Sequence, residues 1–199
     1  MVYNQRKNMA IQLDSKIPGA ISYIWNTISK ILQNMDLDKL NFLPDWDEEK
    51  FHFDDEGEEW KTAPQREAAK AMYLKWREVF GLVIAFAENL PDEPDEDGHE
   101  SHAQTTSRFI YENAMIVAPK IMGAAGCDLY ILKMENAAII RTNCRQMMEQ
   151  VGFAVLMDMA DEEHKKVIEE SLNEFQKLFS EWVATFKKDE FEDEWGLFK

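Results

Sequence analysis

Apolar residues recur at helical spacing in five stretches of the chain. They fall three or four positions apart, so in each stretch they share one face of a helix with 3.6 residues per turn. The stretches cover residues 18–35, 62–90, 110–124, 128–159 and 161–186. No comparable run alternates apolar and polar residues as a strand would, and the 199 residues include only 8 glycines. The pattern predicts an all-α fold.

Several residues are typical of helix ends. Thr62 and Gln65 have capping-box spacing, and Asp128 and Asp161 are candidate N-caps for the helices that follow them. The short connection around Gly126 favours an antiparallel hairpin of the third and fourth helices. The fourth helix, 128–159, is apolar nearly all round, which is typical of a helix packed on several sides. We therefore expect a four- or five-helix bundle with this hairpin at its centre.

Length and composition favour one domain over residues 1–199. A chain of this length with 45% hydrophobic residues can bury a substantial core, and it contains no Gly/Ser-rich linker. The N-terminal residues lack a secretory signal, and no apolar run approaches the roughly 20 residues that span a bilayer. Cys127 and Cys144 are too far apart on the predicted helix to form a disulfide. These features predict a soluble, cytoplasmic protein that does not enter a membrane.

The net charge of −16 is concentrated in a few segments. Residues 36–60 carry a net charge of −9 and residues 91–100 carry −6, so the helical stretches are almost neutral. We interpret 36–60 and 91–103 as acidic connectors and 189–199 as an acidic-aromatic tail. This charge argues against direct nucleic-acid binding, which requires basic patches.

Aromatic residues alternate with acids in the first connector and in the tail. In one interpretation, the acidic residues keep the connectors solvated and the aromatic side chains pack back onto the helix ends. Aromatic anchors in a negative field that bind a basic protein are the other. The candidate partner-binding residues are Trp46, Phe51, Phe53, Trp60 and Trp195.

Polar residues recur every seven positions in the third and fourth helices, and a seven-residue spacing keeps them on one helix face. Buried amides that fix helix register would explain the repeat, and so would a pocket for a small acidic ligand. The candidate ligand-binding residues are Asn113, Lys120, Asn136 and Asn143. Arg141, Arg145 and Glu149 form a separate line on the fourth helix, and the arginines are candidates to pair with acids of neighbouring helices.

Motifs for metal binding and catalysis are incomplete. Glu93, Asp95, Asp97 and Gly98 follow the first half of an EF-hand calcium loop, but Gln104 replaces the glutamate required at position 12. No nucleophile elbow or phosphate loop occurs. We therefore predict no catalytic residues, metal or cofactor. The sequence favours a non-enzymatic protein-interaction module that binds a basic protein or a second copy of itself. The alternative is a helical bundle, with or without enzymatic activity, that binds a small ligand or metal at a polar site between the third and fourth helices.

Overall fold

The computed structural model describes residues 43–48, 59–94, 97–191, 193–196 and 198, with side chains of the first described helix from residue 63 onward. By contacts between Cα atoms the chain divides into two units, Met1–Leu37 and Asp38–Lys199. All described residues belong to the second unit. The helix predicted at 18–35 lies outside the described residues, and so do Phe51 and Phe53.

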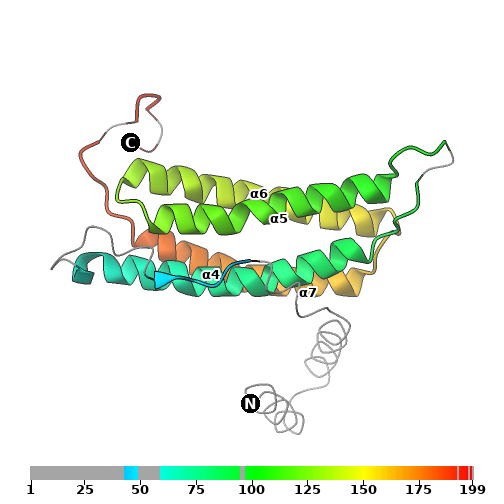
Figure 1. Cartoon of the computed structure of the whole chain (residues 1–199), viewed down its shortest axis with the longest axis horizontal. Coiled ribbons are helices and arrows are strands. Elements are labelled where there is room, and N and C mark those ends of the chain that lie inside the picture. The colour runs from blue at the N-terminus through cyan, green and yellow to red at the C-terminus, as the bar shows by residue number, and fades with distance from the viewer. Residues whose placement is uncertain (1–42, 49–58, 95–96, 192, 197, 199) are drawn as a thin grey trace, which may run out of the picture. The chain divides into compact units, whose positions relative to one another are not determined.

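The described part of the chain contains four α-helices and no strands. The helices are α4 (Glu59–Glu88), α5 (His102–Ala125), α6 (Tyr130–Leu156) and α7 (Glu162–Ala184). The all-α prediction is thus confirmed for these residues. Helix α4 packs extensively against α5 and α7, and α5 packs against α6, whereas α6 and α7 touch much less. Figure 1 shows that consecutive helices run in opposite directions.

The starts of three helices differ from the predicted ones. Helix α4 begins at Glu59, three residues before Thr62. The N-cap of α6 is Leu129, so the prediction that Asp128 caps this helix is wrong. Helix α5 begins with a capping box that sequence analysis missed. Ser101 Oγ accepts a hydrogen bond from the backbone N–H of Gln104 at 3.2 Å, and Gln104 Oε1 accepts one from the backbone N–H of Ser101 at 3.0 Å. The residue at position 12 of the EF-hand-like loop therefore serves as a helix cap.

The core lies between the four helices, and α4 contributes much of it. The largest fully buried side chains come from all four helices: Met72, Tyr73, Trp76, Val79, Val83, Ile110, Ile121, Ile140, Met147, Ile168, Phe175 and Trp182. Helix α6 differs from the expectation that it is packed on several sides. Its Leu132 and Phe153 are exposed, and Leu156 is 78% exposed. The reason is that α6 packs closely against α5 alone, while α7 touches it sparsely.

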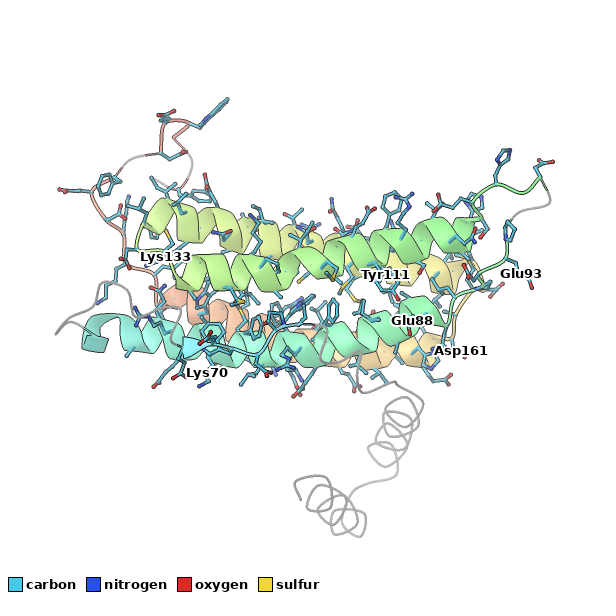
Figure 2. All side chains as sticks on the ribbon, viewed as in Figure 1. Lys70, Glu88, Glu93, Tyr111, Lys133 and Asp161 are labelled. Carbon is cyan, nitrogen blue, oxygen red and sulfur yellow. The ribbon has the colours of Figure 1, made fainter. Side chains whose placement is uncertain are left out.

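Polar contacts connect α4 to its neighbours. Tyr111 of α5 donates a hydrogen bond to Glu88 of α4 at 3.1 Å (Figure 2). Burial, with a smaller effect from the Glu88 charge, raises the pKa of Tyr111 to about 12. Lys75 of α4 forms an ion pair with Glu174 of α7. These contacts supplement the apolar packing that holds α4 against α5 and α7.

Candidate functional site

The four candidate ligand-binding residues lie on α5 and α6. Asn113, Asn136 and Asn143 each donate a side-chain hydrogen bond to the carbonyl four residues earlier in their own helix, at 2.7, 2.8 and 2.9 Å. Asn143 is buried, whereas Asn113, Asn136 and Lys120 are half-buried. Such local bonds satisfy part of the hydrogen-bonding capacity of each side-chain amide without a ligand. The ligand site stays a prediction.

The candidate partner-binding aromatics have different environments. Trp46 is half-buried and packs on Tyr73, with 5.4 Å between ring centroids. Tyr73 also donates a hydrogen bond to the Pro44 carbonyl at 2.6 Å, so residues 43–48 lie along α4 (Figure 1). Trp195, in contrast, is 87% exposed, and its neighbour in the tail, Phe191, is 60% exposed. The backbone of Trp60 belongs to α4, but its side chain is outside the described part.

The tail is attached to the start of α6. Leu129 offers no side-chain cap, and Asp189 Oδ2 accepts the hydrogen bond of the Tyr130 amide at 2.8 Å. The other carboxylate oxygen of Asp189, Oδ1, accepts a hydrogen bond from the backbone N–H of Phe191 at 3.1 Å. A carboxylate is a favourable cap because the N-terminus of a helix carries unpaired N–H groups and partial positive charge. Asp189 thus caps α6 from 59 residues further along the chain.

A buried lysine lies near this cap. Lys133 of α6 is buried and donates a hydrogen bond to Gln65 of α4 at 3.0 Å (Figure 2). Burial lowers the pKa of Lys133, and the nearby charges of Asp128 and Asp189 partly offset that effect. The ammonium group therefore joins α4 to α6 where the tail begins.

Replacing Asp189 by alanine is expected to destabilise the fold by about 1 kcal/mol, because the Tyr130 amide loses its acceptor. Urea unfolding followed by circular dichroism measures this difference. Asp189→Asn is the matched control, since asparagine is an equally good N-cap residue and should retain most of the stability. An alanine variant as stable as the unmodified chain would show that the cap has no net effect.

A groove lies between α6 and α7, where the helices touch least. Its volume is about 580 Å³. The apolar lining comes from both helices: Ile140, Cys144 and Met148 of α6, and Leu172, Phe175 and Phe179 of α7. The polar lining residues are Arg141, Arg145, Glu149, Gln176 and Ser180. A mainly apolar groove of this size, with a few charged groups, has the composition of a binding site. We call it the α6–α7 groove.

Two arginines stand one helical turn apart on the α6 side of this groove. Arg141 and Arg145 are exposed, and within the described residues neither forms an ion pair or a hydrogen bond. The expectation that they pair with acids of neighbouring helices is therefore not met among these residues. Five other cations do have carboxylate partners: Lys70, Lys75, Arg77, Arg108 and Lys165. The groove thus presents two guanidinium groups to a partner, beside the one carboxylate of its lining, that of Glu149.

Cys144 forms part of the groove wall. Burial raises the pKa of its thiol to about 12. The thiolate is the nucleophilic form of cysteine, so at neutral pH this side chain acts as an apolar lining residue.

The described residues offer neither a cluster of metal ligands nor a membrane-spanning helix. Across residues 43–48, 59–94 and the described positions beyond 96, no three His, Cys, Asp or Glu side chains gather so that they could hold a metal ion. No described helix combines the length and apolar character needed to cross a membrane. The chain matches no family model, no curated protein and no solved structure.

Proposed function

We propose that this chain is a non-enzymatic protein-interaction module, a four-helix bundle that includes the α5–α6 hairpin, and that it binds through residues 189–199. We call these residues the acidic-aromatic segment. The observation that carries the proposal is the exposure of Phe191 (60%) and Trp195 (87%). Each aromatic side chain can bury roughly 150–250 Å² on binding, and aromatic residues are frequent anchors of interfaces. Two free thiols, at Cys127 and Cys144, support a reducing compartment such as the cytoplasm.

The charges around the two aromatics define the chemistry of the partner. Glu190, Asp193 and Glu194 each lie within two residues of Phe191 or Trp195 in the sequence. Carboxylates around an aromatic anchor favour a positively charged surface, because complementary charges accelerate encounter and disfavour other partners. The Asp189 cap holds the base of the segment, which lowers the entropy lost on binding.

Two observations support a non-enzymatic role. The raised pKa of Cys144 keeps the buried thiol protonated at neutral pH, so it is a poor nucleophile. The amides of the polar repeat donate to their own helices. Both groups therefore have structural explanations, whereas the exposed aromatics do not.

Photo-crosslinking tests the proposal. We would introduce p-benzoylphenylalanine at Trp195 and, as a matched control, at Leu74, which is 46% exposed on α4. We expect Trp195→p-benzoylphenylalanine to crosslink to arginine- or lysine-rich peptides, identified by mass spectrometry, in much higher yield than the control. The yield should fall near 1 M NaCl, where the screening length is about 3 Å. Equal yields from the two positions would contradict the proposal.

A further inference from the structure

We infer that the partner of the acidic-aromatic segment is a second copy of this chain. The segment of one copy docks in the α6–α7 groove of the other. Phe191 and Trp195 then contact the apolar lining, and the carboxylates of the segment face Arg141 and Arg145. This inference rests on the proposed function and adds the identity of the partner and the site that it offers.

The groove and the segment have complementary chemistry. Of the six apolar side chains that line the groove, Met148 and Phe179 are only partly buried, and the segment supplies two aromatic rings that are mostly exposed. Aromatic pairs stabilise contacts beyond the area they bury. Arg141 and Arg145 have no carboxylate partner in the described part of the chain, and the segment carries Glu190, Asp193 and Glu194. Guanidinium and carboxylate groups form the strongest charge-assisted hydrogen bonds, often two at a time.

The reach of the segment favours another copy over the chain's own groove. The bond from Asp189 to the Tyr130 amide fixes the base of the segment at the start of α6. Phe191 is two residues beyond this point, and two extended residues span at most about 7 Å. The groove begins near Ile140, ten residues along α6 from Tyr130, which is roughly 15 Å at the helical rise. While the cap is in place, Phe191 does not reach its own groove. Trp195, six residues beyond Asp189, spans at most about 20 Å, so the restriction applies to docking of both rings together.

A second copy has no such restriction. Each copy carries one segment and one groove, so a reciprocal exchange makes two equal contacts. Such an exchange closes into a two-fold symmetric dimer, the commonest form of homo-oligomer. The inferred assembly is therefore a dimer with two identical segment–groove interfaces.

Sedimentation equilibrium of the full chain tests the inference. The unmodified chain should dimerise at concentrations up to about 100 μM. Arg141→Glu/Arg145→Glu should raise the dimer Kd at least about tenfold, because both positive charges of the groove are reversed. Lys166→Glu/Lys177→Glu is the matched control. It changes the net charge equally, and its exposed α7 residues do not line the groove. This control should dimerise almost as tightly as the unmodified chain.

Charge reversal on the segment provides a second arm. A chain with Glu190→Lys, Asp193→Lys and Glu194→Lys should dimerise poorly by itself. Mixed with the Arg141→Glu/Arg145→Glu chain, it should form a heterodimer, because both interfaces then pair opposite charges: the basic segment faces the acidic groove, and the acidic segment faces the basic groove. Circular dichroism of each variant checks that α-helix content is unchanged. Failure of the two chains to associate, although both are folded, would overturn the inference.

Other outcomes separate this inference from the proposed function. A chain that stays monomeric at about 100 μM overturns the second-copy partner. If the dimer dissociates with Phe191→Ala/Trp195→Ala but not with Arg141→Glu/Arg145→Glu, the α6–α7 groove is not the docking site. In both cases crosslinks from position 195 to a basic protein would leave the proposed function intact. A dimer that none of these changes weakens overturns the segment–groove contact altogether.

Discussion

Replacing Trp76 by alanine is expected to lower the free energy of unfolding by about 3–5 kcal/mol. Trp76 is fully buried in α4, and its ring packs against Phe175 of α7 with 5.2 Å between centroids. Truncation leaves a large cavity at the interface of α4 and α7, one of the extensive contacts of the fold. Denaturant unfolding followed by circular dichroism measures the loss, and a change of slope would reveal altered compactness.

Trp76→Phe is the informative control. The indole Nε1 of Trp76 is buried and has no hydrogen-bond partner among the residues that the structure describes. A buried unsatisfied donor costs about 1–3 kcal/mol, so removing it offsets part of the packing that phenylalanine loses. We expect Trp76→Phe to lose well under half of what the alanine variant loses. Equal losses would contradict this account of the indole group.

Alkylation of Cys144 is expected to be about 1000-fold slower in the folded chain than in denaturant at pH 8. Burial raises the pKa of this thiol from near 9 to about 12, and a rise of three units lowers the thiolate fraction about 1000-fold. Iodoacetamide labelling followed by peptide mass spectrometry resolves the two cysteines separately. Cys127, half-buried in the α5–α6 connection, is the internal reference. Similar protection of both thiols would point to a cause other than burial of Cys144.

The same pKa shift predicts a pH dependence of stability. The folded pKa of Cys144 lies above its unfolded value, so the stabilising contribution is complete below pH 9 and is lost as the pH rises towards 12. Cys144→Ala should reduce the slope of unfolding free energy against pH in this range.

Sequence periodicity predicted the helices well because each buries an apolar face. The stretches at 62–90 and 161–186 correspond to α4 and α7 within a few residues at either end. Helix starts were harder to predict when the cap is distant. Asp128 lies one residue before the N-cap position, which Leu129 occupies, and Asp189 supplies the hydrogen bond. A contact over 59 residues depends on the tertiary fold and leaves no local signal.

The candidate sites show a similar limit. The seven-residue repeat placed Asn113, Asn136 and Asn143 on defined helix faces, but spacing does not reveal that each amide turns back to its own backbone. The line of Arg141 and Arg145 was visible in the sequence. The groove beside them depends on how sparsely α7 touches α6, and periodicity carries no information on that separation.

The distant cap on α6 also sets an order of events during synthesis. Tyr130 is made 59 residues before its acceptor, Asp189. At about 5–20 residues per second, roughly 3–12 s pass between them on the ribosome. During that interval the first turn of α6 has no side-chain cap, while α4 and α5 are already complete in sequence. The start of α6 is thus stabilised only after the whole of α7 has been synthesised.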